Sequence, residues 1–136
     1  MGDPETEVVL PRLQTDLVAL FAAMDNGTLA DVNINFDERS YATIVAVSGG
    51  YPGNYEKGKV INLLVDKFTA ADSFIFHAGT KQLANEVVTN GGRVLAVTSF
   101  GDTLLEAAKK SIAVLDEIGF EGMYFRKDIG YEFENQ

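Results

Sequence analysis

Cysteine and tryptophan are absent from this sequence of 136 residues, and histidine occurs once, at His77. The absence of cysteine excludes disulfides, zinc ribbons and a thiol nucleophile. Positive charge is also scarce, because 11 Lys and Arg residues stand against 20 Asp and Glu residues and give a formal net charge of −9. Nucleic acids and anionic membranes attract clustered positive charge. We therefore expect no nucleic-acid partner and no membrane partner.

Long apolar runs are missing too. No run approaches the roughly 20 residues that a membrane-spanning helix requires, and the N-terminus lacks the basic and apolar regions of a signal peptide. We expect a soluble, cytoplasmic protein. The composition, 46% hydrophobic and 23% charged, is typical of one globular domain with a hydrophobic core. Met1 leads directly into Gly-Asp-Pro-Glu-Thr, and this abrupt start predicts that the chain is cut from a longer protein.

Two segments carry the hydrophobic spacing of amphipathic helices. The first helix is predicted over residues 11–24, with Pro11 in its first turn, where a missing N–H costs nothing. The second is predicted over residues 103–118. There, Thr103 and Glu106 form the Ser/Thr-x-x-Glu pattern that caps helix N-termini.

Between these helices the pattern changes to short β-branched and apolar segments. Strands are predicted at residues 32–36, 43–47, 60–65, 73–76, 87–88 and 94–98, with a final short segment at 123–125. Seven of the thirteen glycines fall between Gly49 and Gly92, which indicates tight turns between antiparallel strands. The order of helix, strands and helix predicts an α+β fold, with a helix packed on a curved antiparallel sheet or a small barrel.

The segment from Gly53 to Lys59 has nearly the spacing of a phosphate-binding P-loop. However, Val60 follows where the motif needs a Ser or Thr hydroxyl for magnesium. A P-loop must also begin a helix, and residues 60–65 have the pattern of a strand. We therefore do not expect a P-loop.

A glycine-rich loop, Ser48 to Gly53, follows a predicted buried strand. Its glycines lack Cβ atoms and can bring backbone N–H groups close to a ligand. The same residues can also make an ordinary turn between two strands. The sequence leaves both interpretations open.

Two further motifs carry charge or proton-transfer chemistry. His77 is a candidate for acid–base work near neutral pH, but no nucleophile pattern or second histidine accompanies it, which favours a structural role at a strand end. Arg126 and Lys127 can bind an anionic substrate. They can equally form a solvated ion cluster with Asp128.

Asp3 and Glu5 flank Pro4 near the start of the chain. Two carboxylates are fewer ligands than an oxygen-liganded magnesium site normally uses. The templates for metal, nucleophile and phosphate-loop chemistry all stay incomplete. We therefore predict no metal site and no complete catalytic site in this chain.

Six motifs recur together in one order: Gly2–Thr6, Val9–Leu13, Ser48–Gly58, Phe76–Lys81, Val87–Leu95 and Phe120–Gly130. In this order and spacing they resemble the phosphoribosylamine–glycine ligase family, also called the glycinamide ribonucleotide synthetase family. The resemblance covers nearly the whole chain. Each motif alone is weak, but the combination is specific.

The resemblance implies an ATP-grasp ligase of de novo purine synthesis, which joins glycine to 5-phosphoribosylamine and converts ATP to ADP and phosphate. In this family the glycine carboxylate is phosphorylated and the amine then attacks, with magnesium neutralising phosphate charge. Family members are much longer, and their Glu-x-Asn metal ligands precede the Gly-Asp-Pro-Glu-Thr motif. ATP and magnesium thus belong to the full-length enzyme. We expect neither in this chain, and we expect it to be inactive alone.

The resemblance also implies domain boundaries and substrate contacts. Residues 1–30 correspond to the last edge of the ATP-grasp domain with its connecting helix, and residues 31–136 to the C-terminal domain of the ligase. That domain is similar to the barrel-like hybrid motif at the C-terminus of biotin carboxylase. The substrate-binding residues implied for this sequence are Asp3, Glu5, Gly49, Gly50, Tyr51, Pro52, Lys57, Arg126 and Lys127.

Two other functions stay open. One is a freestanding module with the same fold that binds a phosphorylated sugar or a partner through residues 49–53. The other is an interaction role, in which the helix predicted over residues 11–24 docks on a missing domain. In that case its apolar residues would be partly exposed: Leu13, Leu17, Leu20 and Phe21.

Overall fold

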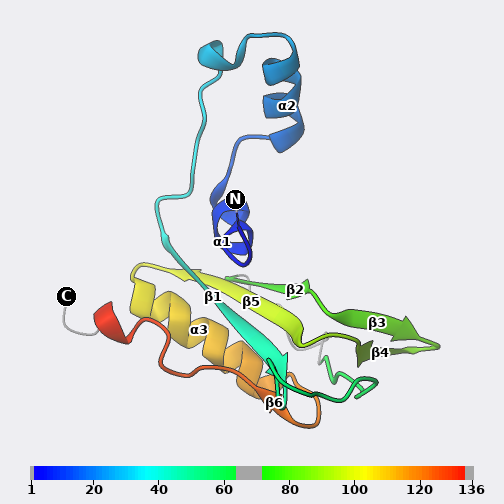
Figure 1. Ribbon diagram of the computed structural model, residues 1–136. Helices are drawn as coiled ribbons and strands as arrows, with labels where there is room; N and C mark the ends of the chain where they lie inside the picture. Colours follow the sequence, from blue (N-terminus) through cyan, green and yellow to red (C-terminus); the bar gives the residue numbers. More distant parts are fainter. Residues whose placement is uncertain (1, 64–71, 134–136) are drawn as a thin grey trace.

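An antiparallel sheet with one long helix packed on it forms the body of the molecule (Figure 1). The computed structural model describes residues 2–63 and 72–133. In chain order its elements are α1 (Thr6–Arg12), α2 (Leu17–Asp25), η1 (Leu29–Asp31), β1 (Ser40–Ser48), β2 (Ser73–His77), β3 (Thr80–Leu83), β4 (Glu86–Thr89), β5 (Arg93–Gly101), α3 (Leu104–Glu117), β6 (Met123–Tyr124) and η3 (Tyr131–Phe133).

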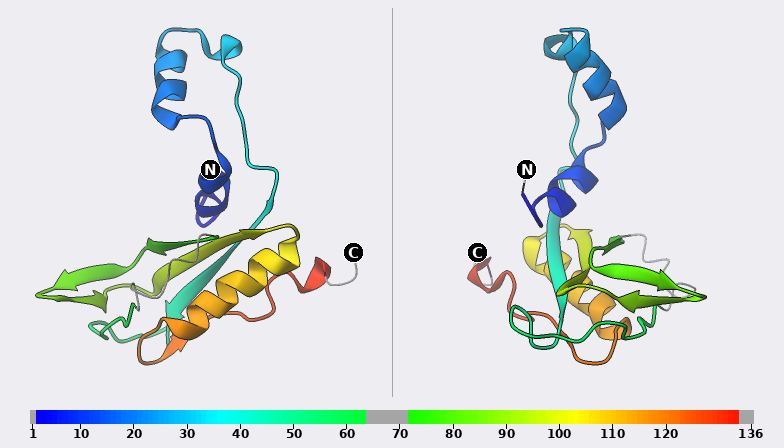
Figure 2. Two further views of the ribbon diagram at one scale, coloured as in Figure 1. Left: turned by 180° about the vertical axis from the view of Figure 1, so that it is seen from behind. Right: turned by 45° about the vertical axis from the view of Figure 1, so that its right-hand side comes forward.

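The main sheet has four antiparallel strands in the order β2-β5-β1-β6. β1 pairs with β5 along nearly its whole length, from Ser40 opposite Gly101 to Val47 opposite Arg93. β3 and β4 form a separate two-stranded hairpin that extends from the body (Figure 2). These features confirm the predicted α+β fold. Among the described strands, the order is that of an open, curved sheet.

The core lies between α3 and the two central strands. Val94, Leu95 and Val97 of β5 have no exposed surface, and neither does Leu115 of α3. Burying side chains of this size stabilises the fold by roughly 1.5–3 kcal/mol each. The buried Ser111 hydroxyl donates a hydrogen bond to the backbone oxygen of Ala42 at 3.0 Å. The one polar group that α3 brings into this interface is thus satisfied.

α3 begins at the predicted cap. Thr103 Oγ1 accepts a hydrogen bond from the Glu106 backbone nitrogen at 3.1 Å. Glu106 Oε2 in turn accepts from the Asp102 backbone nitrogen at 2.9 Å, and the carboxylate also pairs with Lys110. The predicted helix over residues 103–118 is confirmed.

The single helix predicted over residues 11–24 is wrong. α1 ends at Arg12, so Pro11 lies in the last turn of one helix and not in the first turn of another. Asp16 then starts α2, because its side chain accepts a hydrogen bond from the Ala19 backbone nitrogen at 2.8 Å. Because this cap lies inside a continuous apolar pattern, hydrophobic periodicity alone predicts one helix where the structure has two.

The strand predicted over residues 32–36 is also wrong. This segment forms no strand, and Phe36 makes one isolated bridge, to Leu13. The alternation of apolar side chains there is real, but the described residues place no sheet beside it. Ile34 and Phe36 are consequently exposed.

The remaining strand predictions have mixed outcomes. Four lie within β1, β2, β4 and β5 and are confirmed, and the segment at 123–125 contains β6. In the segment 60–65, Val60 and Asn62 make only isolated bridges, and residues 64–65 lie outside the described part. β3 was not predicted, because its four residues are mostly polar and exposed.

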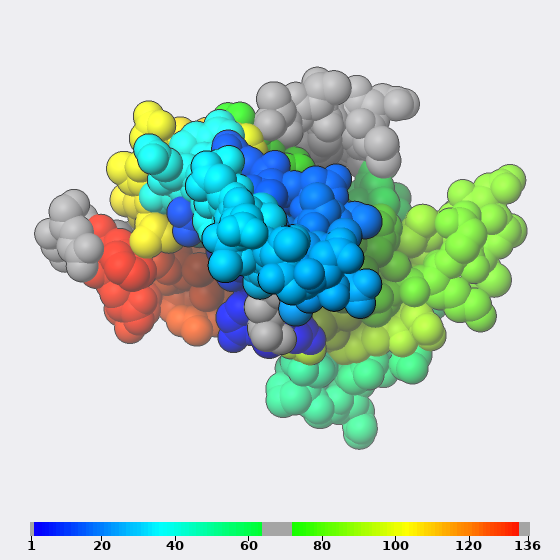
Figure 3. Space-filling model, turned by 90° about the horizontal axis from the view of Figure 1, so that it is seen from above, coloured from blue at the N-terminus to red at the C-terminus, as the bar shows by residue number. Residues whose placement is uncertain are grey.

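Residues 13–36, which include α2 and η1, form an arm that projects from the body (Figures 1 and 2). Its two ends meet at the base, where the Asp37 backbone nitrogen donates to the Arg12 backbone oxygen at 2.7 Å. α2 buries only Leu20 and Ala23. In the view from above, the arm, in blue to cyan, lies in front of the middle of the body (Figure 3). Its exposed apolar side chains are Val18, Phe21, Met24, Leu29, Ile34 and Phe36.

The helices are short, with 7 residues in α1, 9 in α2 and 14 in α3. Within residues 2–63 and 72–133, none of them has both the length and the apolar character needed to cross a membrane. The longest, α3, instead packs one side on the sheet and leaves its other side exposed to solvent.

Candidate functional site

A groove runs between α1 and the sheet. It consists of three adjoining cavities of about 280, 340 and 350 Å³, which we number first, second and third. Thr43, Arg126 and Ile129 line both the first and the second cavity. Val45 and Tyr51 line both the second and the third. Because the cavities share walls, they form one continuous surface, which we call the α1 groove.

The alternation of side chains along β1 builds the floor of this groove. Ile44 and Ala46 are buried in the core. The half-buried Thr43, Val45 and Val47 lie on the opposite face and line the groove. The unbroken apolar run of this strand predicts that both of its faces are packed against other elements. α3 packs on one face, and α1 packs on part of the other.

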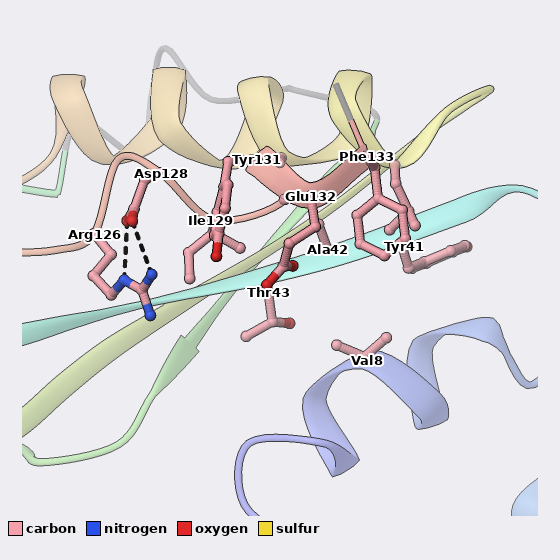
Figure 4. Close-up of a pocket in the computed structure, with 13 residues that line it drawn as sticks. Val8, Tyr41, Ala42, Thr43, Arg126, Asp128, Ile129, Tyr131, Glu132 and Phe133 are labelled. Carbon is pink, nitrogen blue, oxygen red and sulfur yellow. Dashed lines mark hydrogen bonds and ion pairs between the residues drawn. The ribbon is translucent and has the colours of Figure 1, made fainter. Parts of the chain in front are cut away.

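The first cavity lies where the C-terminal segment passes β1 and α1 (Figure 4). Arg126 donates through Nε and Nη2 to the two carboxylate oxygens of Asp128, at 2.9 and 2.8 Å. These hydrogen bonds hold the pKa of Asp128 below its usual value. Both side chains are more than half exposed. The guanidinium is therefore fixed in direction but still accessible to an anion from the groove.

Tyr51 separates the second cavity from the third. A Cβ atom at Gly92 would overlap the Tyr51 ring, so the ring lies directly on the glycine backbone. Gly50 has φ +93°, a conformation that side chains rarely adopt, and a Cβ there would overlap the Asn54 carbonyl. The Tyr51 backbone nitrogen donates to the Ser48 oxygen at 3.0 Å. The loop is thus a tight turn that presents Tyr51 to the groove.

Asp3 reaches the third cavity and forms an ion pair with Arg93 at the start of β5. The pair places a carboxylate and a guanidinium side by side at the cavity rim. Arg93 is 41% exposed, and among the described residues its guanidinium makes no other hydrogen bond. Sequence reasoning assigned no role to Arg93. The only signal for it was its place inside the motif Val87–Leu95.

Glu7 lies between the third cavity and an apolar cavity of about 390 Å³ on the other side of α1. Its Oε2 atom is buried and has no hydrogen-bond partner in the described part of the chain. Burial raises the pKa of this carboxyl group, and the charge of Asp3 raises it further, while Arg93 opposes the shift. The group therefore holds a proton more readily than an exposed glutamate. Nothing in the sequence pattern distinguished Glu7 from a surface carboxylate.

Three of the predicted substrate-binding residues line the groove: Asp3, Tyr51 and Arg126. Gly49, Gly50 and Pro52 belong to the loop that carries Tyr51, and a Cβ at Gly49 would overlap the backbone oxygen of Gly122. These residues shape the site rather than line it.

The other predicted site residues lie outside the groove. Glu5 is exposed at the N-terminus of α1, and Lys57 is exposed in the loop that follows Tyr51. Lys127 turns toward the end of α3, where its Nζ lies 3.0 Å from Asp116 Oδ1. In this arrangement Arg126 and Lys127, although adjacent in sequence, do not converge on one ligand.

His77 ends β2 and pairs with Leu95 of β5 in the sheet. Its exposed imidazole places Nδ1 3.1 Å from Thr80 Oγ1. Among the described residues no carboxylate forms a hydrogen bond with the ring. This geometry agrees with a structural role at a strand end.

The segment from Gly53 to Lys59 precedes a bridge to β4 and not a helix. Lys59 Nζ is held by two carboxylates, Glu56 at 2.8 Å and Glu121 at 3.0 Å. A P-loop needs its lysine free for phosphate and its backbone at a helix start. The prediction that this segment is not a P-loop is confirmed.

One known family matches most of the body of this chain. The family "Phosphoribosylglycinamide synthetase, C domain" matches residues 41–132. The match begins at the second residue of β1 and ends within η3. It therefore covers the sheet and α3 but not α1 or the arm.

Individual relatives align with nearly the whole chain. The phosphoribosylamine–glycine ligase of Vibrio cholerae is 46% identical over 130 residues, which are 96% of this chain and 30% of that protein. The bifunctional purine biosynthetic protein of Dictyostelium discoideum is 46% identical over 136 residues, 99% of this chain and 17% of that protein. The crystal structure of phosphoribosylamine–glycine ligase from Thermotoga maritima superposes with a TM-score of 0.70 at 32% identity, covering 94% of this chain and 31% of that one. The chain thus spans about a third or less of the length of these relatives.

Proposed function

Because the chain belongs to the phosphoribosylglycinamide synthetase C-domain family, we propose that it is the C-terminal part of a phosphoribosylamine–glycine ligase. The family match over residues 41–132 is the observation that carries this proposal. The proposed reaction is ATP-dependent and joins glycine to 5-phosphoribosylamine in de novo purine synthesis. A charged, phosphorylated substrate does not cross membranes unaided, so the proposal also places the enzyme in the cytoplasm.

The α1 groove is the part of this chain that we assign to the phosphorylated substrate. Among the described residues that line the second cavity, Arg126 is the only charged side chain, and the Asp128 carboxylate with which it pairs lines the first cavity instead. A guanidinium that faces a largely apolar wall, with the hydroxyl-bearing Thr43, Tyr51 and Tyr124 beside it, is suited to a phosphate group. Tyr51 and the Asp3–Arg93 pair lie next to it in the third cavity. In this role the chain binds and orients the substrate, and the bond-forming chemistry belongs to the rest of the ligase.

The residues present do not fit a magnesium site. The described ranges contain no group of three His, Asp or Glu side chains that could hold a metal ion. Asp3 is also already paired with Arg93. In the complete ligase, magnesium-bound ATP supplies the phosphoryl group that activates the glycine carboxylate. Our proposal assigns ATP, magnesium and glycine to the part of the ligase outside this chain, and the chain alone is then inactive.

We further propose that residues 1–30 complete the edge of the ATP-grasp domain and that residues 31–136 form the C-terminal domain. The family match begins only at residue 41. α2 packs against η1 and exposes Val18, Phe21 and Met24. Exposed apolar side chains gathered on one projecting element are typical of an interface with another domain.

A reconstitution assay tests the proposed function. The chain is mixed with the part of the Vibrio cholerae ligase that precedes the matching region, together with ATP, magnesium, glycine and phosphoribosylamine. Mass spectrometry should detect glycinamide ribonucleotide from the mixture and none from either polypeptide alone. The matching C-terminal part of the Vibrio ligase serves as the positive control. Product from this chain alone would refute its assignment as a dependent part. No product from the mixture, while the control restores activity, would refute the proposed function.

A further inference from the structure

The third cavity of the α1 groove combines an aromatic ring, a carboxylate and a guanidinium in about 350 Å³. The Tyr51 ring is held against the Gly92 backbone and forms one wall. Asp3 and Arg93 pair across the rim, although they lie 90 positions apart in the sequence. The fold, and not the local sequence, therefore brings these three groups together.

The charges of the second and third cavities differ. The second cavity is lined by Arg126 and, among the described lining residues, by no acidic group. The Asp128 carboxylate that pairs with Arg126 lines the first cavity and not the second. In the third, the positive charge of Arg93 is balanced by Asp3, and Glu7 lies in the wall. A phosphate is favoured in the second cavity and disfavoured in the third, because an anion there meets a carboxylate at the rim.

A neutral sugar ring suits the third cavity. A guanidinium donates hydrogen bonds and a carboxylate accepts them, so a paired Arg and Asp can bind two neighbouring hydroxyl groups at once. An aromatic face offers a large apolar surface for the C–H groups of the ring. Tyr51 lines both cavities, so a ligand can place its phosphate on one side of this residue and its ring on the other.

We propose that the third cavity is a ribose subsite. The hydroxyl groups on C2 and C3 lie against the paired Asp3 and Arg93, the ring packs on Tyr51, and the 5-phosphate occupies the second cavity beside Arg126. Arg93 is then a substrate-binding residue that donates hydrogen bonds to the ribose hydroxyl groups. This inference rests on the proposed function, because it identifies the part of the substrate that each cavity binds.

The test compares three ligands by NMR titration of the chain: ribose 5-phosphate, 2-deoxyribose 5-phosphate and inorganic phosphate. Deleting the C2 hydroxyl removes a hydrogen bond to a charged group. The Kd of the deoxy sugar should therefore be about tenfold higher than that of ribose 5-phosphate. In Arg93→Gln and Asp3→Asn, the two sugars should bind with nearly equal Kd, whereas the Kd of inorganic phosphate should not change.

Lys109→Gln is the matched control, because it also removes one positive charge but from the exposed side of α3. It should keep the preference for ribose, and thermal unfolding of every variant checks that the fold is retained. The subsite is overturned if the two sugars bind equally to the unmodified chain, or if no sugar binds at tens of millimolar. It is also overturned if Arg93→Gln keeps the preference.

The outcomes separate this inference from the proposed function. Ligase product in the reconstitution assay without ribose discrimination would overturn the subsite and leave the function in place. Clear ribose discrimination without any ligase product, while the Vibrio control is active, would overturn the function and leave a ribose-binding cavity.

Discussion

The body and the arm contain similar apolar side chains in opposite environments. Val94 in β5 has no exposed surface, whereas Val18 in α2 is 74% exposed. The apolar pattern of α2 is as strong as that of the buried strands, so composition does not decide burial. What decides it is whether the same chain supplies a surface to pack against. The body supplies such a surface for α3 and the central strands, and we infer that the arm finds its partner surface in the rest of the ligase.

The base of the arm is nevertheless tied firmly to the body. The Arg12 guanidinium donates to the Asp37 backbone oxygen at 3.0 Å. The Asp37 carboxylate accepts hydrogen bonds from Arg39 and, at 3.1 Å, from the Tyr41 hydroxyl. Arg39 in turn lies over the Phe100 ring, 3.8 Å from its centroid. The arm thus has a fixed base and a tip whose apolar side chains are exposed.

The largest effect on stability should come from matched valine substitutions. Val94→Ala removes two methyl groups from the core and leaves a cavity, which should lower the free energy of unfolding by about 2–3 kcal/mol. Val18→Ala removes the same groups from an exposed helix position and should change it by less than about 0.5 kcal/mol. Urea unfolding measures both. An equal loss in the two variants would show that the arm belongs to the same cooperative core.

The next effect should come from the base of the arm and should depend on pH. The hydrogen bonds from Arg39 hold the pKa of Asp37 well below its usual value. A carboxyl group whose pKa is lower in the folded state stabilises the fold above its unfolded pKa, and this stabilisation is lost as the pH falls through the folded pKa. Asp37→Asn should therefore destabilise the chain at pH 7, by an amount that shrinks below about pH 4.

Thermal unfolding of this variant across pH checks the prediction. Tyr41→Phe removes only one of the hydrogen bonds to Asp37. It should therefore also destabilise the chain at pH 7, but by less than Asp37→Asn does. A loss of stability that is the same at every pH would mean that the Asp37 charge is not what secures the base.

A smaller change in the free energy of unfolding, this time a gain, is expected from substitution of Glu7 in α1. Burial raises the pKa of Glu7 in the folded state. The contribution of this group to stability is therefore fully present at pH values below its unfolded pKa. It is lost as the pH rises through the folded pKa. Glu7→Gln removes the buried charge and should stabilise the chain at pH 7 by at most about 1 kcal/mol. At pH 4 the two proteins should differ little. Destabilisation at pH 7 would contradict the unpartnered state of this carboxyl.

The smallest effect on stability is expected at the tip of the arm. Phe21→Asp places a charge at a position that is already 58% exposed, so the free energy of unfolding should change by less than about 0.5 kcal/mol. In the reconstitution assay the same variant should lose most of the product, because a charge would be buried in the proposed interface. Asp25→Asn, at the end of α2, is the control that should keep activity. Full activity of Phe21→Asp would remove the arm from the interface.

Sequence reasoning succeeded where local pattern and final environment agree. The 103–118 helix and the central strands follow from periodicity and from the cap at Thr103, because each buries its apolar side within the body. It failed in the arm, where the described part of the chain places no sheet beside the 32–36 pattern. Tyr51 and Arg126 could be proposed from motifs. Glu7 and the Asp3–Arg93 pair could not, because their state depends on α1 packing against a strand some 90 residues away.

Hydrogen exchange measures the difference between body and arm most directly. In the chain alone, the α2 amides should exchange by local opening and at least about a hundredfold faster than those of residues 94–98, which open only on global unfolding. Addition of the preceding part of the Vibrio cholerae ligase should slow α2 strongly and leave residues 94–98 nearly unchanged. Equally slow exchange of α2 and β5 in the chain alone, or no slowing of α2 on addition, would contradict our account.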